Sequence, residues 1–212
     1  MIDLFQSRIA CNSYLLWKDK EHAILIDPGY NVNNCLIEHI KRLKLHIDAV
    51  LITHVHYDHI DGLEAVVKEF PNVEIFIYEK ESKDLDNPKF NLSVWSEWGN
   101  KNLVYRPEKL HELMDGESFD TCGYTLKCIA TPFHTRGSAC YLVDEENALF
   151  TGDTLFYTTV GRTDLTSSTP RTMSSSLLKL VSLEKDYDIY PGHGPKTHLE
   201  REKKYNSYLR NI

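Results

Sequence analysis

A segment rich in metal-binding side chains lies at residues 53–59, whose sequence is THVHYDH. It carries three imidazoles and one carboxylate, the groups that divalent transition metals bind most readily. The apolar run AVLI at residues 49–52 directly precedes it and predicts a buried strand. In an extended chain, His54 and His56 project to the same side, while Asp58 and His59 follow where the strand should turn into a helix. The segment therefore predicts a metal site at the end of a strand.

Three further residues of metal-binding type each follow a short apolar run. His134 comes after a run that ends at Thr131, Asp153 follows LFTG, and His193 stands in the segment PGHG. In sheet-based α/β folds, ligand sites collect at such strand ends. Each of these residues alone would more often be a turn or structural residue, but their combination with the histidine segment is rare by chance. We therefore expect all of these side chains to meet around metal ions.

The segments between these residues show alternating strand and helix patterns. Apolar runs predict strands at residues 14–17, 23–26, 49–52, 73–78, 125–131, 148–152 and 187–190. Helical spacing of apolar residues predicts helices at residues 33–43, 61–70, 170–184 and from 199 onward. We expect Asp61 to cap the second helix, and Leu177, Leu178 and Val181 to face inward from the third. Residues 84–110 are expected to be irregular.

Length and composition indicate an ordinary globular protein. The chain has 212 residues, of which 42% are apolar and 26% charged, and we expect one domain over residues 1–212. The formal net charge of −7 supplies no general basic field, so no nucleic-acid partner is expected. No stretch approaches the roughly 20 apolar residues that span a bilayer, so no membrane partner is expected. The sequence alone says nothing about oligomeric state.

The cysteines and the amino terminus indicate the compartment. Five cysteines form an odd set without any Cys-x-x-Cys pair, which is typical of free thiols in a reducing compartment. The first residues, MIDLF, carry an acid where a secretory leader would have basic residues, and no long apolar segment follows. A cytoplasmic location is therefore expected.

The ordered set of histidines and aspartates, from Asp27 to His193, resembles that of the metallo-β-lactamase superfamily. This resemblance implies a mixed α/β fold, a four-layer αββα sandwich with two metals at one edge. It implies that one metal is bound by His54, His56 and His134, that the other is bound by Asp58, His59 and His193, and that Asp153 bridges them. It also implies that Asp27 supports the histidine segment. Such a donor set exceeds one tetrahedral zinc and suits two divalent ions, with zinc the default and iron or manganese compatible.

Within that superfamily the sequence most resembles the hydroxyacylglutathione hydrolases (glyoxalase II) and their short relatives. The segments TPFHT at 131–135, FTGDTLF at 150–156, GRTDL at 161–165 and PGHGP at 191–195 carry the resemblance. True β-lactamases of this fold usually carry cysteine at the position of Asp153, which argues against β-lactam hydrolysis. Phe133 and Arg136 depart from the glycine and proline common around the middle histidine. No counterpart is expected of the C-terminal helical domain that contacts glutathione in full-length glyoxalase II.

The resemblance implies hydrolysis of a small S-acyl thioester, similar to hydroxyacyl-glutathione, by a metal-bound hydroxide. Asp58 is the expected catalytic residue, orienting the hydroxide and accepting its proton. Arg136, Tyr141 and Arg162 are candidate substrate-binding residues. The aromatic side chains of residues 90–105, namely Phe90, Trp95, Trp98 and Tyr105, are further candidates, although a core or interface role suits them as well.

Other activities on the same fold stay open. A persulfide dioxygenase would use one iron held by His54, His134 and Asp153, and a lactonase would use almost the same nucleophile chemistry. A phosphodiesterase or ribonuclease would need a nucleic-acid-binding arm or extra domain, which neither the length nor the charge supplies. A non-enzymatic metal-binding protein would have little reason to keep every donor of the set.

Overall fold

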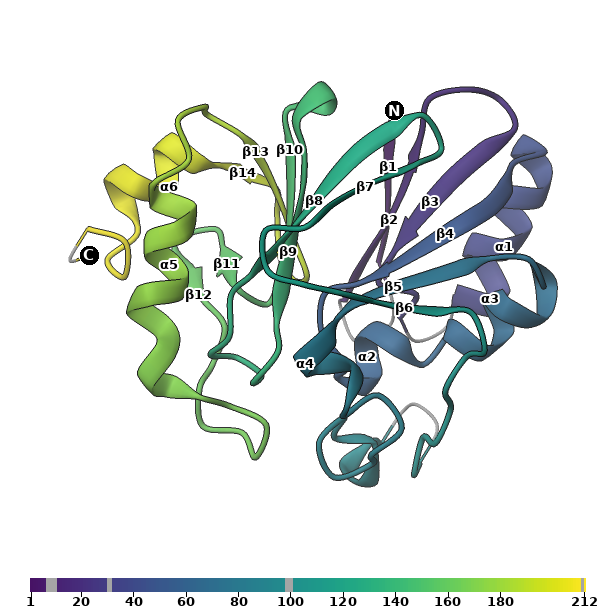
Figure 1. Cartoon of the computed structure of the whole chain (residues 1–212), viewed down its shortest axis with the longest axis horizontal. Coiled ribbons are helices and arrows are strands. Elements are labelled where there is room, and N and C mark those ends of the chain that lie inside the picture. Colours follow the sequence, from purple (N-terminus) through teal and green to yellow (C-terminus); the bar gives the residue numbers. More distant parts are fainter. Residues whose placement is uncertain (7–10, 30–31, 98–100, 211) are drawn as a thin grey trace.

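Two β-sheets face each other across an apolar layer, and helices cover the outer face of each sheet (Figure 1). The structure is a computed structural model that describes residues 1–6, 11–29, 32–97, 101–210 and 212. Helices α1 and α3 lie on the right of the view, and α5 and α6 lie on the left. This arrangement confirms the expected four-layer αββα fold.

The first sheet has six strands in sequence order. They are β1 (Ile2–Gln6), β2 (Asn12–Trp17), β3 (His22–Ile26), β4 (His46–Ile52), β5 (Glu74–Tyr78) and β6 (Leu110–Leu113). The pairs β1–β2 and β2–β3 are antiparallel, whereas β3, β4, β5 and β6 run parallel to one another. Because β3 and β4 are parallel, the residues that follow them lie at the same edge of the sheet.

The second sheet also has six strands, in the order β14-β13-β10-β9-β8-β7. They are β7 (Ser118–Thr121), β8 (Tyr124–Ala130), β9 (Ala139–Val143), β10 (Ala148–Gly152), β13 (Asp188–Pro191) and β14 (Thr197–His198). Strands β10 and β13 are parallel, so the residues after Gly152 and Pro191 lie together. A separate hairpin joins β11 (Leu155–Phe156) and β12 (Thr159–Val160).

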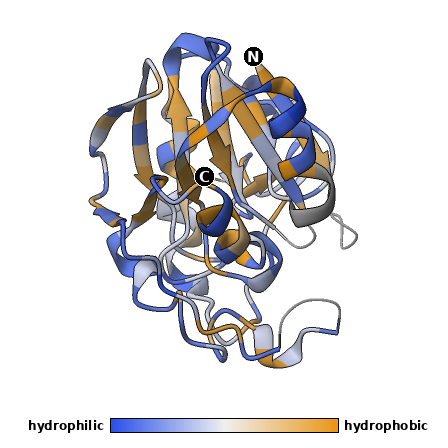
Figure 2. Ribbon diagram, turned by 90° about the vertical axis from the view of Figure 1, so that its right-hand side faces the viewer, coloured by the Kyte–Doolittle hydropathy of each residue, from blue (hydrophilic) through white to orange (hydrophobic). Residues whose placement is uncertain are grey.

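Helices and 3-10 turns connect and cover the strands. The helices are α1 (Val32–Leu43), α2 (Tyr57–Ile60), α3 (Leu63–Glu69), α4 (Glu79–Ser82), α5 (Met173–Val181) and α6 (Leu199–Tyr205). The 3-10 turns are η1 (Ser93–Trp95), η2 (Asp144–Glu146) and η3 (Pro170–Thr172). Figure 2 shows the strands largely orange, while blue residues lie on the helices and loops around them.

Three buried apolar clusters correspond to the spaces between the layers. One lies between the first sheet and α1 and α3, and includes Ile40, Val50 and Val66. The second fills the space between the two sheets, and the third packs α5 and α6 against the second sheet. Burial of this apolar surface is the main force that holds the layers together.

Backbone hydrogen bonds join the two sheets where the functional edge lies. The Ala139 amide donates to the Thr53 carbonyl at 2.9 Å, and the Asn12 amide donates to the Gly192 carbonyl at 2.7 Å. Cys11 forms an isolated antiparallel bridge with His193. The residue after β4 is thereby fixed against the first residue of β9, and the residue after β13 against the first residue of β2.

Two local predictions about the helices are wrong. Gly62, not Asp61, is the N-cap of α3, because Asp61 still continues α2 in right-handed helical geometry. Leu177 is buried and Val181 packs partly buried against the same core, as expected, but Leu178 is half exposed. Ser176 and Leu180 are buried instead, so the inward face of α5 is rotated away from Leu178.

Among the residues that the structure describes, no helix is both long and apolar enough to cross a membrane. Cys11, Cys122, Cys128 and Cys140 form no disulfide, as expected. The side chain of Cys35, together with Trp98, lies outside the described residues.

Candidate metal centre

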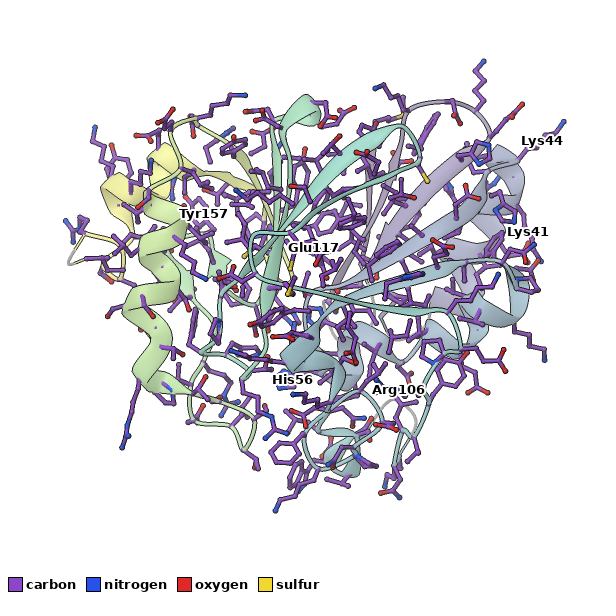
Figure 3. All side chains as sticks on the ribbon, viewed as in Figure 1. Lys41, Lys44, His56, Arg106, Glu117 and Tyr157 are labelled. Carbon is purple, nitrogen blue, oxygen red and sulfur yellow. The ribbon has the colours of Figure 1, made fainter. Side chains whose placement is uncertain are left out.

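The side chains with metal-binding chemistry converge at one edge of the molecule, between the two sheets. The donor atoms of His54, His56 and His134 all lie within 4.8 Å of one another. The donor atoms of a second group, Asp58, His59 and His193, meet the same limit. Figure 3 shows His56 in the lower part of the molecule, below α4. The structure thus assembles the two groups that the resemblance implies.

Asp153 lies between these two groups. Its Oδ2 is 3.3 Å from His134 Nε2 in the first group and 3.6 Å from His193 Nε2 in the second. Its Oδ1 is 3.5 Å from His59 Nε2. One carboxylate therefore contacts both groups, which is the position that a bridging ligand requires.

Two donor atoms of the cluster are buried without a hydrogen bond among the described residues: His54 Nε2 and Asp153 Oδ1. A buried polar atom without a partner costs about 1–3 kcal/mol, so such atoms are rare in native proteins. A cation between the two groups would satisfy both atoms. The donor set of nitrogen and carboxylate oxygen also suits zinc, iron and manganese. The cluster therefore fits divalent metal ions.

Asp27 fixes the histidine segment through hydrogen bonds to Thr53 and His59. It follows β3, and its carboxylate accepts hydrogen bonds from the Thr53 amide at 2.8 Å, the Thr53 hydroxyl at 2.6 Å and His59 Nδ1 at 2.9 Å. Because Nδ1 of His59 donates to Asp27, the lone pair of neutral His59 lies on Nε2, which faces the cluster. Asp27 thus sets both the position and the tautomer of His59.

The other histidines are oriented in the same way. His134 Nδ1 lies 2.9 Å from the Arg162 carbonyl, to which it donates, so that Nε2 carries the lone pair. His56 Nε2 lies 2.9 Å from Ser167 Oγ, and donation to this hydroxyl leaves the lone pair on Nδ1. The loop of residues 161–169, which the resemblance singled out only as GRTDL, therefore orients two histidines of the first group.

Electrostatics favour neutral imidazoles at His54 and His56 and charge in the second group. Burial and the neighbouring imidazoles hold the pKa values of His54 and His56 well below the ordinary value. Burial alone would raise the pKa of Asp58, but His59 and His193 outweigh it and lower the pKa. Burial alone would lower the pKa of His193, but Asp153 and Asp58 outweigh it and raise the pKa. Metal binding requires deprotonated donors, so it displaces protons mainly from the second group.

Glycines let the ligand-bearing turns approach one another closely. Gly152 has φ +46°, and a Cβ there would overlap the Thr53 side chain of the opposite sheet. A Cβ on Gly192 would overlap Asp153 Oδ1 and lie 2.6 Å from His59 Cε1. The space around Asp153 is therefore filled by its neighbours, with no room for even one methyl group at position 192.

Glu81 joins the two segments that carry the first group of ligands, a role that no sequence pattern indicates. It lies in α4 and is fully buried. Its Oε1 accepts from the Val55 amide at 2.8 Å, and its Oε2 accepts from the Thr135 hydroxyl at 2.9 Å. Val55 lies between His54 and His56, and Thr135 follows His134, so a single carboxyl holds both segments.

Substitution Glu81→Gln should flatten the dependence of stability on pH. Burial raises the pKa of Glu81 from 4.5 to about 7. The folded protein therefore binds this proton more tightly than the unfolded chain, so the stabilisation is present below pH 4.5 and is lost as the pH rises to 7. We expect wild type to lose up to about 3 kcal/mol relative to the variant over this interval. Urea unfolding of the chelated proteins measures the difference. The exposed Glu108→Gln is the matched control, and parallel curves for wild type and Glu81→Gln would contradict the expectation.

Tyr141 does not line the site, which corrects the prediction for this residue. It lies in β9 and is fully buried between the sheets. Its hydroxyl donates to the Ile52 carbonyl at 2.9 Å. The residue therefore supports the end of β4 from inside the core and has no surface for a substrate.

Neither arginine presents a free guanidinium. Arg136 forms an ion pair with the buried Asp84 and lies over the ring of Phe90, 4.3 Å from its centroid. Arg136 is therefore engaged by the protein and is not available as an anion contact. Arg162 is largely exposed and binds both carboxylate oxygens of Asp164, at 2.6 and 2.7 Å. Its carbonyl orients His134, whereas contact of its side chain with a substrate stays a prediction.

The family model of the metallo-beta-lactamase superfamily matches residues 7–193. The chain therefore belongs to the metallo-beta-lactamase superfamily, as its fold and its histidine and aspartate cluster indicate. Members of this superfamily include metal-dependent hydrolases, and the relatives below bear such names.

Curated relatives and solved structures agree with this assignment. A probable metallo-hydrolase of Streptococcus pyogenes is 34% identical over 93% of this chain and 85% of its own length. A hydroxyacylglutathione hydrolase of Haemophilus influenzae is 32% identical over 93% of this chain and 92% of its own. The crystal structure of BLEG-1 B3 metallo-beta-lactamase is 32% identical, covers 99% of both chains and has a TM-score of 0.90. A protein solved in a di-iron-bound form is 27% identical, covers 96% of this chain and 97% of its own, and has a TM-score of 0.82.

Proposed function

We propose that this protein is a metal-dependent hydrolase of small S-acyl thioesters. The observation that carries the proposal is the pair of donor groups with Asp153 between them and two buried donor atoms lacking a hydrogen bond. The name of the Haemophilus relative, a hydroxyacylglutathione hydrolase, supports the thioester class. We further propose two divalent ions, with zinc as the default.

Two metal ions, when bound, lower the pKa of a water molecule and polarise a carbonyl oxygen. His54, His56 and His134 would hold one ion, and Asp58, His59 and His193 the other. Asp153 would bind both, because its two oxygens already reach histidines of both groups. The role of the chain is to fix these donors in direction, while metal binding displaces protons from the imidazoles of the second group.

Asp58 is the residue that we propose as proton acceptor. Its Oδ2 lies 3.3 Å from His193 Nε2, and its lowered pKa keeps it ionised at neutral pH. Its side chain is 18% exposed whereas that of His59 is fully buried, so a water molecule can reach Asp58. A thiol leaves as thiolate with a pKa of about 8.5, so the reaction needs no strong general acid.

Metal analysis combined with substrate turnover tests this proposal. We expect about two equivalents of divalent metal per chain, turnover of S-lactoylglutathione or a simpler S-lactoyl thioester, and reversible loss of activity on chelation. The same preparation is assayed for oxygen uptake with glutathione persulfide, for lactone opening and for β-lactam opening. Thioester turnover above the other activities supports the proposal. One equivalent of iron with oxygen uptake and no thioester turnover would replace it with a persulfide dioxygenase.

A further inference from the structure

A pocket of about 340 Å³ opens beside the histidine segment. It is called the Trp95 pocket here, and its lining residues are Tyr57, Leu92, Trp95, Asp164, Leu165 and Thr166. In Figure 1 both loops that carry them lie below the sheets, the segment of residues 84–97 on the side of α2 and α4 and the green loop before α5 on the opposite side. Tyr57 stands between His56 and Asp58 in the chain, and Thr166 precedes Ser167, which contacts His56. The pocket therefore adjoins the metal centre through its own wall residues.

The wall that carries Leu92 and Trp95 is held against the histidine segment. The Tyr57 amide donates to the Asn91 carbonyl at 2.8 Å. The buried Asn91 side chain donates to the carbonyls of Leu85 at 3.1 Å and Leu103 at 2.9 Å, which ties both ends of the loop. The part of the segment around Asn91 is thus a fixed wall of the pocket, and Asn91 anchors it to the ligand-bearing turn.

Apolar side chains stand exposed on this wall. Trp95 is 59% exposed, although a large aromatic ring is ordinarily placed where it buries most of its surface. Leu92 has φ +63°, a left-handed conformation that costs a non-glycine residue about 1–2 kcal/mol. Such strained residues cluster at binding sites, where the surrounding structure holds them in place. Both features place apolar surface on the wall that the Tyr57–Asn91 hydrogen bond holds against the histidine segment.

The charges at the pocket do not suit a carboxylate. Asp164 is the charged residue of the lining, and Arg162 binds both of its carboxylate oxygens. None of the described lining residues is a lysine, arginine or histidine. A ligand group seated here meets the side chains of Tyr57, Leu92, Trp95 and Leu165 and a carboxylate that is already paired with Arg162.

On the basis of the proposed thioester hydrolysis, we propose that the Trp95 pocket binds an uncharged apolar or aromatic part of the substrate and thereby sets specificity. The group is seated between Tyr57, Leu92, Trp95 and Leu165 while the thioester carbonyl lies at the metal centre. Thioesters whose remote groups are neutral and apolar are therefore preferred over those that carry carboxylates.

A binding experiment tests the pocket without requiring turnover. The probe is S-benzyl-N-acetylcysteamine, an uncharged thioether that cannot be hydrolysed, titrated into the metal-loaded protein by calorimetry. We expect Trp95→Ala to weaken its binding by about 10-fold or more, because one buried aromatic contact is lost. Val104→Ala, an equally exposed apolar residue of the same segment outside the pocket, should change the Kd by less than about twofold. Equal Kd values for wild type and Trp95→Ala would overturn the proposal.

Turnover then identifies which end of the substrate enters the pocket. One series varies the acyl group, from acetyl to phenylacetyl, on N-acetylcysteamine, and the other varies the thiol, up to benzyl mercaptan, with a constant lactoyl group. We expect Trp95→Ala to lower kcat/KM by about 10–100-fold for the apolar members of one series and little for the smallest members. A uniform loss across both series would contradict a role in specificity. Absence of all thioester turnover, with probe binding that still depends on Trp95, would refute the proposed function and leave the pocket intact.

Discussion

Asp153→Ala is expected to lower thioester turnover by at least about 1,000-fold, because under the proposed function one carboxylate serves both metal ions. Its oxygens reach His134 and His193, which belong to different donor groups. Removal of the carboxylate leaves two clusters of imidazoles with less negative charge between them. We therefore expect the metal content to fall below two equivalents per chain. Metal analysis by mass spectrometry and kcat on one S-lactoyl thioester measure both effects.

A matched control separates the loss of a ligand from the loss of a charge. Asp120→Ala removes one exposed carboxylate on β7, far along the chain from the donor residues, and should retain full metal and activity. Asp153→Ala with two bound metals and unchanged kcat would contradict the bridging role. It would also remove the main support for hydrolysis at a two-metal centre.

Gly192→Ala is expected to have the second-largest effect, although it removes no donor atom. The added Cβ would overlap Asp153 Oδ1 and lie 2.6 Å from His59 Cε1, so both side chains would have to move. Overpacking of this kind typically costs about 1–3 kcal/mol of stability. Because displaced donors bind metal poorly, we also expect activity to fall by at least about 100-fold. Urea unfolding, metal content and kcat measure the three consequences.

Gly194→Ala serves as the control for this substitution in the same turn. Gly194 has φ +76°, and no atom lies within 4 Å of the Cβ that alanine would add. This variant therefore carries backbone strain of about 1–2 kcal/mol without a clash. We expect it to lose stability but to keep its metal content. If both variants lost metal equally, strain in the turn rather than contact with Asp153 would explain the effect of Gly192→Ala.

The side chains of the metal centre could be predicted to converge because each follows a strand. Parallel pairing of β3 with β4, and of β10 with β13, brings Asp27, His54, Asp153 and His193 to one edge. The family resemblance then implied which donors bind which metal ion. The spacing of these residues in the sequence does not indicate this assignment. Each strand that the apolar runs predicted overlaps an observed strand, whereas β1, β6, β7, β9 and β14 were not predicted.

Residues whose role depends on pairing across the sheets escaped prediction. Tyr141 lies in β9, a strand that was not predicted although its sequence ACYLV is a continuous apolar run, and its ring enters the space between the sheets. Glu81 is an acidic residue in a short helix, and its sequence context resembles a solvated surface. Glu81 is buried because the His54 segment of one sheet and the His134 segment of the other meet around its carboxyl group. Long-range contacts of this kind leave no periodic signal in the chain.

The hydrogen bonds from Ala139 to Thr53 and from Asn12 to Gly192 join the two sheets beside the metal centre, and the metal donors come from both halves of the chain. The first half of the chain contributes His54, His56, Asp58 and His59, while the second half contributes His134, Asp153 and His193. Each of the two metal-binding groups therefore contains residues from both halves of the chain. A cation bound here would cross-link the two halves of the chain. The affinity for the ion would therefore be linked to the free energy of unfolding.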